Sequence, residues 1–275
     1  MAKLNSISRR AALETGLASA AAILTSTGFA ATPEDVPKKA PGETRVLFLG
    51  GDELHNFATQ EQGLRSICEK AGWTFFSAHD ARYITAPLVA STDLMMIERW
   101  SGGGVLGWVP GPIQIQGATE DNYMSPELEN LIVGNVVNRG MGFLSIHCTI
   151  WALGNEKFLD MLGIRPIIHG PLQTVHLHNF NPDHPISRGM KPFDLALDEN
   201  FGVEITGNGV VPLYETFGLS DKRQDYGGWA HEKGKGRVAG LLGGHTHFAF
   251  ESPQYCELFR RAAWWALNRD IPAQT

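Results

Sequence analysis

The chain has 275 residues, of which 43% are hydrophobic and 19% charged, and its formal net charge is −6 at pH 7. This composition is typical of a globular protein and argues against both a disordered chain and a membrane-spanning fold. Because the charge is negative and no Lys/Arg-rich run follows the N-terminus, nucleic acid is not expected as a partner.

The first thirty residues have the pattern of an export signal. A Ser-Arg-Arg run at residues 8–10 precedes a weakly hydrophobic, small-residue stretch that ends near Ala30. The paired arginines indicate the bacterial twin-arginine route, so we expect residues 1–30 to be removed and the mature protein to be periplasmic or secreted, with no membrane attachment. A membrane anchor is disfavoured because the segment is short and contains Glu14. Residues 31–43, rich in Pro, Lys and Glu, predict a flexible leader.

Strands and helices alternate through the first half of the remaining chain. Continuous apolar runs and helical spacing predict strands at 45–49, 73–77, 94–97 and 142–147, and helices at 58–70 and 126–139. The second helix opens with Ser125 as its cap and Pro126 in its first turn. This alternation predicts a three-layer α/β fold, in which helices cover both faces of a mostly parallel sheet.

The second half of the chain is richer in strands. Extended segments are predicted at 174–180, 193–197, 211–217, 229–232 and 237–242, and Ser252-Pro253 opens a closing amphipathic helix. We interpret residues 44–270 as one domain with strand-rich insertions. Long loops at 101–122 and 218–228 are expected to line or cover a site.

A glycine turn follows the first predicted strand in "FLGGDELHNF" (48–57). Ligands of open α/β sheets bind at the carboxyl ends of strands, so Gly51, Asp52 and His55 are expected to border a site. The third glycine of a dinucleotide-binding turn is absent, and no nucleotide cofactor is expected.

Histidines gather after predicted strands. His55, His147 and His245 each follow a strand near a glycine, and the three should converge on one rim of a parallel sheet. Imidazoles in such a cluster could shape a pocket or bind a divalent metal, and both alternatives stay open. The histidines interpreted as structural, bonded to backbone at a strand end, are His176, His178 and His231.

The segment "GFLSIHCTIWALG" (142–154) raises the choice between His147 and Cys148 as the working residue. Neither has the glycine neighbours of a nucleophile elbow, and the two isoleucines beside Cys148 fit that turn less well. Cys148 is therefore expected to be a small buried residue. The three cysteines of the chain also argue against a disulfide framework.

An acidic pair, Asp198-Glu199 in "LDENF", is the main carboxylate candidate. Carboxylates beside imidazoles serve as general bases, orient a histidine or bind sugar hydroxyls. A solvated turn is the competing interpretation.

A set of ordered motifs resembles the trehalose-utilisation ThuA family across nearly all of residues 44–269. The motifs, in chain order, are "LGGDELH", "GMGFLSIH", "FLDMLGIRPIIH", "DHPISRGM", "LDENF", "GKGRVAGLLGGH" and "RRAAWWAL". The resemblance implies a flavodoxin/amidotransferase-like fold in which His147 stands where class I glutamine amidotransferases place their nucleophilic Cys. Family members often carry Tyr where this chain has Phe201. The family's recurrent polar positions correspond here to His55, His147, His169, His184, Asp198, Glu199 and His245.

The resemblance further implies a role in carbohydrate catabolism. We expect an exported enzyme that acts on a glycoside or an oxidised (3-keto) sugar, with a co-exported sugar oxidoreductase as the candidate partner. His147 and Glu199 are the acid–base candidates, and His55 and His245 complete the catalytic set or hold a metal. The alternatives are a metal-dependent hydrolase or lyase and a non-catalytic periplasmic module that binds a sugar or a partner. The residues expected to bind substrate are Gly51, Asp52, Trp151, His169, His184 and Asp198.

Overall fold

The computed structural model describes residues 36–52, 55, 57–100, 124–151 and 156–273. The predicted export signal and the long loop predicted after the third strand lie outside these described residues. Among the residues that are described, no helix has the length and apolarity needed to cross a membrane.

The described end of the predicted leader, residues 36–43, contacts the domain. Lys39 Nζ forms an ion pair with Asp93 Oδ1 at 2.5 Å, and Arg45 Nη1 donates a hydrogen bond to the carbonyl oxygen of Pro37 at 2.9 Å. These contacts hold the segment beside the amino ends of the first and third strands.

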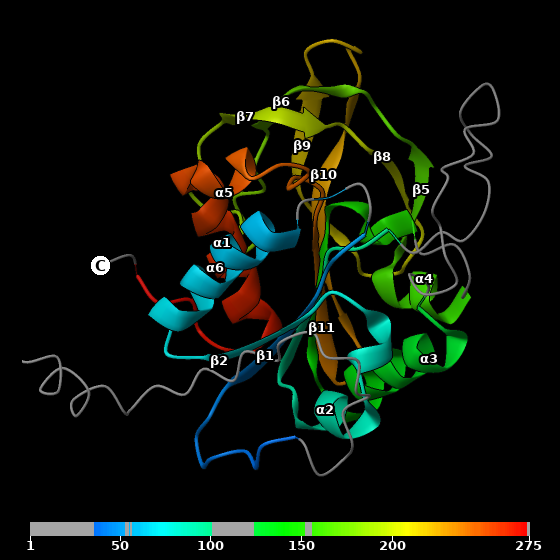
Figure 1. Cartoon of the computed structure of the whole chain (residues 1–275). Coiled ribbons are helices and arrows are strands. Elements are labelled where there is room, and N and C mark those ends of the chain that lie inside the picture. Colours follow the sequence, from blue (N-terminus) through cyan, green and yellow to red (C-terminus); the bar gives the residue numbers. More distant parts are fainter. Residues whose placement is uncertain (1–35, 53–54, 56, 101–123, 152–155, 274–275) are drawn as a thin grey trace, which may run out of the picture. The chain divides into compact units, whose positions relative to one another are not determined.

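Five parallel strands form one side of a nine-stranded sheet (Figure 1). They are β1 (Arg45–Leu49), β2 (Thr74–Ala78), β3 (Leu94–Ile97), β4 (Gly142–Ile146) and β11 (Gly236–Leu241). Their order is β2-β1-β3-β4-β11, and each neighbouring pair is parallel. The carboxyl ends of these strands therefore lie along the same edge of the sheet, as the sequence predicts.

Antiparallel strands continue the sheet beyond β11. They are β6 (Leu172–His178), β7 (Phe193–Glu199), β9 (Val211–Gly218) and β10 (Gln224–Lys233), in the order β11-β10-β9-β6-β7. A separate two-stranded sheet pairs β5 (Ile164–Ile168) with β8 (Gly202–Ile205). These are the expected strand-rich insertions.

The prediction of a long loop at 218–228 is wrong. β9 and β10 instead form a hairpin, and only residues 219–223 connect them. The start of β10 has no apolar run by which a strand could be predicted, because Gln224 and Tyr226 are exposed. Their backbone nevertheless pairs with β9.

Helices cover both faces of the parallel strands (Figure 1). On one face lie α1 (Phe57–Lys70), α5 (Phe248–Glu251) and α6 (Pro253–Ala266), and on the other α2 (Ala86–Ser91), α3 (Pro126–Gly134) and α4 (Glu156–Leu162). Short turns are the 3-10 segments η2 (Ala81–Tyr83) and η5 (His147–Trp151) and the π turn η4 (Asn135–Arg139). The α/β three-layer prediction is confirmed.

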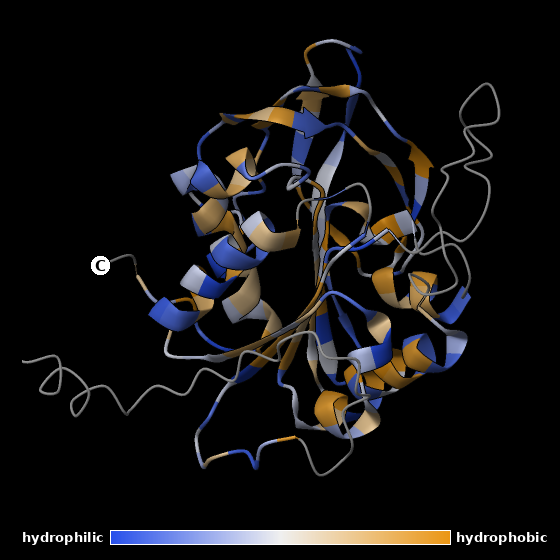
Figure 2. Ribbon diagram, viewed as in Figure 1, coloured by the Kyte–Doolittle hydropathy of each residue, from blue (hydrophilic) through white to orange (hydrophobic). Residues whose placement is uncertain are grey.

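The core consists of two apolar clusters separated by the sheet. Val46 and Phe48 of β1 belong to the cluster under α1 and α6, whereas Leu47 and Leu49 belong to the one under α3 and α4. This alternation follows the two-residue period of a strand, and all five β1 residues are buried. Figure 2 shows apolar residues on helices at both sides of the sheet.

The predicted helix starts are confirmed. The Ser125 side chain accepts a hydrogen bond from Leu128 N at the start of α3, and Ser252 accepts one from Tyr255 N at the start of α6. Each cap satisfies a backbone N–H that has no partner within the helix.

Candidate functional site at the carboxyl edge of the sheet

The candidate site is built from segments that follow β1, β4 and β11 and from the end of β7. These elements place His55, His147, His245 and Glu199 beside one another. Three of these segments are far apart in the sequence but belong to parallel strands whose carboxyl ends share an edge. The sheet topology therefore brings His55, His147 and His245 together, as the sequence predicts.

His147 stands at a sharp turn between β4 and η5. Its φ of 45° lies in the left-handed region, which is unfavourable for a residue with a Cβ. The next turn is fixed by Thr149 Oγ1, which donates to the carbonyl oxygens of Ile97 at 2.5 Å and Ile146 at 2.9 Å. The backbone thus adopts an elbow-like turn without the glycines, and His147 occupies its apex.

Glu199 is the centre of a group of imidazoles. Its Oε2 lies 3.0 Å from His169 Nε2, 3.2 Å from His245 Nδ1 and 3.4 Å from His147 Nε2. Burial alone would raise the pKa of the Glu199 carboxyl, but the hydrogen bonds from these three imidazoles hold that pKa far below its usual value. Glu199 is therefore an anion, and in return its charge raises the pKa of His245 against the opposing effect of burial.

Depth separates the imidazoles around Glu199. His147 is fully buried, His245 is partly buried, and the side chain of His169 is 46% exposed. His169 thus forms the solvent-facing end of the pair with Glu199, whose side chain is 10% exposed, whereas His147 lies at the base of the site. The sequence alone does not separate these roles.

Asp52 orients His55. The Nδ1–H of His55 donates to the Asp52 carboxylate at 2.7 Å, and the same carboxylate accepts backbone N–H bonds from His55 and Trp100. Desolvation is the main cause that lowers the pKa of His55, with the Asp52 hydrogen bond opposing it. Asp52 therefore positions an imidazole, and its role in substrate binding stays a prediction.

Asp198 has a similar positioning role. Its carboxylate accepts hydrogen bonds from Gly244 N at 2.9 Å, Glu199 N at 2.8 Å and His245 N at 3.3 Å. One buried side chain thereby joins the end of β7 to the turn after β11, and so fixes Glu199 relative to His245.

Gly51 and Trp151 support the site from behind. Gly51 has a φ of 83°, and a Cβ there would lie 2.6 Å from His79 Cβ, so glycine is required by the turn. Trp151 is buried, and its ring packs edge-on against the ring of Phe201, with 6.3 Å between the ring centroids. The Phe201 ring in turn packs against the His147 ring, with 4.6 Å between the centroids, and forms an apolar wall behind the histidine cluster.

Cys148 is buried, as predicted. Its Sγ lies 3.6 Å from His55 Nδ1 and 3.7 Å from Asp52 Oδ2. Burial and then the Asp52 charge raise the pKa of this thiol well above its usual value, so Cys148 is a thiol rather than a thiolate nucleophile.

Glu98 and Arg99 are buried residues that sequence reasoning missed. Gln60 Nε2 donates to Glu98 Oε1 at 2.6 Å, and burial raises the pKa of Glu98 well above its usual value. Arg99 Nη1 donates to the carbonyl oxygens of Gly50, Gly51 and His79, at the carboxyl ends of β1 and β2. The available signal was a charged pair directly after the apolar β3 strand.

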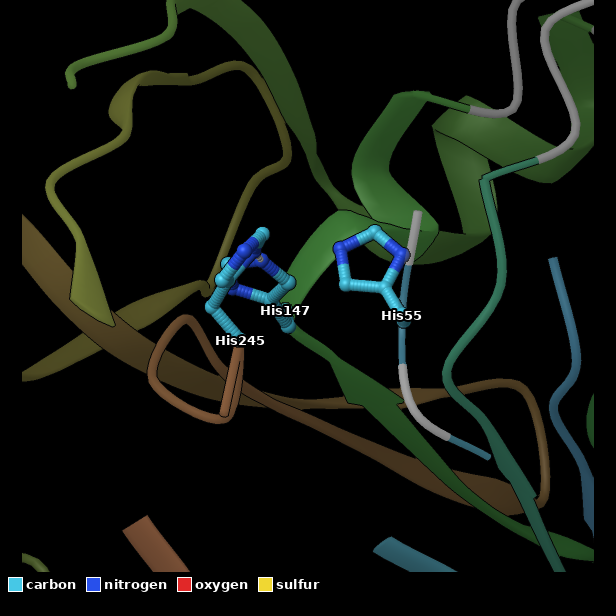
Figure 3. Close-up of side chains that lie close together, drawn as sticks. All are labelled: His55, His147 and His245. Atoms are coloured by element: carbon cyan, nitrogen blue, oxygen red, sulfur yellow. Dashed lines mark hydrogen bonds between the residues drawn. The ribbon is translucent and has the colours of Figure 1, made fainter. Parts of the chain in front are cut away.

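The inner cluster offers ligands for a metal. His55, His147 and His245 each provide one ligand atom within 4.8 Å of the others (Figure 3). Asp52, His55 and Cys148 meet the same distance criterion.

The three histidines interpreted as structural have nearby partners. His176 Nδ1 pairs with Asp194 at 2.6 Å on the surface, His178 lies 4.0 Å from Glu215, and His231 Nε2 donates to the carbonyl oxygen of Met161 at 3.0 Å. None of the three contacts the site. His231 bonds to backbone as the sequence interpretation expects, whereas the partners of His176 and His178 are carboxylates.

His184 lies apart from the candidate site, contrary to its expected role in substrate binding. Its ring is 5.1 Å from that of Trp265 near the end of α6, and the neighbouring Ala266 packs on Gly142 at the amino end of β4. This end of the molecule also has a cavity of about 530 Å³, lined in part by Arg188 and Arg237. The sequence places His184 in a turn but cannot say at which end of the sheet that turn lies.

We expect His184 to make the protein less stable in acid. Burial, then Arg237 and Arg188, lower its pKa from 6.5 to about 4. Between pH 6.5 and about pH 4, the unfolded chain is protonated at His184 and the folded chain is not. The free energy of unfolding therefore falls as the pH drops through this interval. His184→Asn should reduce the loss between pH 7 and about pH 4 by roughly 1 kcal/mol, after allowance for solvent screening of the partly exposed ring.

Urea unfolding of wild type and His184→Asn at both pH values measures this difference. Asn keeps an acceptor near the position of Nδ1, which accepts from Ile186 N at 3.3 Å. An equal loss of stability in the two proteins would show that His184 does not titrate in this way.

Comparison with known proteins shows the fold and the family. A ThuA-like protein from Parabacteroides merdae is 15% identical with a TM-score of 0.66, covering 85% of this chain and 93% of that one. A glutamine amidotransferase from Thermotoga maritima is 11% identical with a TM-score of 0.52, covering 82% and 98%. A beta-galactosidase from Bacillus circulans is 9% identical with a TM-score of 0.54, covering 84% of this chain but 32% of that chain.

A search of the curated proteins found no match to this sequence. The family model described as "ThuA: Trehalose utilisation" matches residues 45–266, which contain every residue of the candidate site. The expected resemblance is confirmed, and this chain belongs to the ThuA family.

Proposed function

We propose that this protein is an exported enzyme of carbohydrate catabolism that acts on a glycoside or an oxidised (3-keto) sugar by His/Glu acid–base chemistry. Membership of the trehalose-utilisation family suggests the carbohydrate-related role. The observation that carries the catalytic proposal is the Glu199 carboxylate, which contacts three imidazoles at the carboxyl edge of the sheet. A sugar-binding surface alone does not need a buried anion with this many ionisable partners.

The pair of His169 and Glu199 supplies the proton chemistry. A ketone acidifies the C–H bond next to it, so a neutral imidazole can remove that proton. The C–H bond breaks, the proton passes to His169, and the electron pair enters the enolate. Glu199, 3.0 Å from His169 Nε2, stabilises the imidazolium that results.

Two outcomes follow from the same enolate. In isomerisation, the enolate oxygen takes the hydrogen of the neighbouring hydroxyl, the imidazolium returns its proton to the former ketone carbon, and the carbon that was deprotonated becomes the new ketone. Alternatively, the bond from the β carbon to the glycosidic oxygen breaks, and the leaving oxygen takes up a proton. Neither route needs a covalent nucleophile, in keeping with the buried thiol of Cys148.

Export and the supply of substrate complete the proposal. The twin-arginine pattern at residues 8–10 supports a periplasmic or secreted location. A 3-keto sugar requires an oxidising step first, so we propose a sugar oxidoreductase, exported alongside, as the source of the substrate. The substrate is a small sugar, and no nucleotide is required for the proton transfer.

A substrate panel tests the proposal. We expect the full chain to convert at least one 3-keto-glycoside when products are followed by mass spectrometry. His147→Ala and His169→Gln should abolish most turnover, and His176→Gln, at an exposed imidazole with its own carboxylate partner, should retain it. Binding without turnover across glycosides and keto-glycosides would instead identify a sugar-binding module.

A further inference from the structure

We propose that His55, His147 and His245 bind one divalent transition-metal ion of the zinc class at the base of the site. This inference deepens the proposed function, but it concerns binding and can be tested apart from turnover. The side chains follow β1, β4 and β11, which place them around one point despite their distance in sequence (Figure 3).

The three rings form a regular tripod. Their centroids are 5.0 Å apart for His55 and His147, 4.9 Å for His55 and His245, and 5.1 Å for His147 and His245. The corresponding interplanar angles are 76°, 75° and 68°, so the rings present edges to one another instead of stacking. Ligation uses the ring edge, where the nitrogen lone pair lies.

Neighbouring groups fix which nitrogens are available. Asp52 accepts from Nδ1 of His55, and the Leu242 carbonyl oxygen accepts from Nδ1 of His147 at 2.9 Å. A carbonyl oxygen can only accept, so His147 Nδ1 carries a hydrogen and Nε2 is the nitrogen directed at His245 and Glu199. Ligation would use the form of His147 in which Nε2 has released its hydrogen. In Figure 3 the Nε2 edge of His55 also faces the other two rings. A carboxylate or carbonyl behind the imidazole, as for His55 and His147, is the arrangement that orients metal-binding histidines.

The ligand spacing suits a tetrahedral ion. Zn–N bonds of about 2.0–2.1 Å place tetrahedral ligand atoms roughly 3.3 Å apart. His147 Nε2 lies 3.1 Å from His245 Nδ1, and Glu199 Oε2 lies 3.4 Å and 3.2 Å from those two atoms. The third nitrogen, from His55, lies within 4.8 Å of the other two ligand atoms.

Charge around the cluster also favours a cation. The carboxylates of Asp52, Asp198 and Glu199 all lie within hydrogen-bond or ion-pair distance of cluster residues. Three nitrogen ligands with a carboxylate at the border match the ligand preference of zinc and its neighbours. Bound there, such an ion would act as a Lewis acid towards a sugar ketone.

The competing ligand set of Asp52, His55 and Cys148 is less suitable. The Asp52 oxygens already accept from two backbone N–H groups and from His55 Nδ1, which points this ring nitrogen away from any ion. Binding there would break the contacts that orient His55.

Metal analysis tests the inference. We expect untagged full-length protein to bind one equivalent of Zn²⁺ by elemental analysis and calorimetry, and its Co²⁺ form to show the intense visible absorption of a tetrahedral site. His55→Gln and His245→Gln should lose this absorption, whereas His176→Gln should keep it. Asp52→Asn should weaken Zn²⁺ binding by about 10- to 100-fold. Circular dichroism of each variant checks that the fold persists, and Asp52→Asn still decides the question if a ligand variant fails to fold.

Three results would overturn the inference: no stoichiometric binding of either ion, Co²⁺ absorption unchanged in both ligand variants, or a sulfur-to-cobalt charge-transfer band that Cys148→Ser removes. Failure of the proposed function is separate. Turnover by a protein that binds neither Zn²⁺ nor Co²⁺ would contradict only the metal site, and stoichiometric metal without turnover would contradict only the enzymatic proposal.

Discussion

Glu199→Gln should reduce turnover of a 3-keto-glycoside by about 1,000-fold, within the range typical for loss of an acid–base group. The substitution keeps the shape of the side chain but removes the charge that three imidazoles face. Its amide nitrogen can only donate, and it would meet the N–H donor of His169. The measurement is kcat and KM for each protein under identical conditions.

The matched control for Glu199→Gln is Asp194→Asn. Asp194 Oδ1 lies 2.6 Å from His176 Nδ1, so this variant also neutralises a carboxylate paired with an imidazole, but on the surface. We expect its turnover to equal that of wild type. A similar loss in both variants would mean that charge removal acts through stability and not through the site.

Asp198→Ala should have the largest effect on stability among the site substitutions. Three backbone N–H groups, of Glu199, Gly244 and His245, would lose their acceptor. Each buried donor left without a partner costs about 1–3 kcal/mol, so we expect the free energy of unfolding to fall by roughly 3 kcal/mol or more. The turn after β11 would also be released, and turnover should fall with it.

Urea unfolding monitored by circular dichroism measures the effect of Asp198→Ala. Asp183→Ala serves as the control, because Asp183 is exposed and its loss should change stability by less than about 0.5 kcal/mol. A free energy of unfolding for Asp198→Ala within about 0.5 kcal/mol of wild type would show that the three N–H groups find other partners. Asp198 would then not be needed to hold the site together.

Much of the site could be predicted because its parts follow the strand pattern. Apolar runs located β1, β3 and β4, and parallel strands must align their carboxyl ends. His55, His147 and His245 could therefore be expected on one rim before any distance was known. The same reasoning does not reach residues outside the parallel strands, so it could not locate His184, which lies beside Trp265 and away from the cluster.

Roles within the site were harder to predict, because they depend on burial and orientation. Asp52 and Asp198 look like exposed polar turn residues in sequence, yet their carboxylates accept backbone N–H bonds at short range. Glu98 and Gln60 form a buried pair at 2.6 Å between β3 and α1, and no pattern in either segment identifies the partner. Such pairings depend on tertiary packing.

Backbone strain was also beyond sequence reasoning. His147 and Leu197 have φ values of 45° and 51°, in a region that favours glycine. At Leu197, near a shift in the pairing of β6 with β7, the irregular backbone turns Asp198 and Glu199 towards the site. Strain of this kind is retained where the surrounding structure enforces it, often beside a functional centre.

Deuterium uptake tests the central claim most directly. A 3-keto-glycoside incubated with the protein in D₂O is followed by NMR at the carbons beside the ketone, together with Glu199→Gln, His169→Gln and Asp194→Asn. We expect wild type and Asp194→Asn to exchange the proton at one of these carbons much faster than buffer, and the other two variants to be close to buffer. Exchange at the buffer rate in wild type, or equal exchange in all four proteins, would contradict acid–base catalysis at this site.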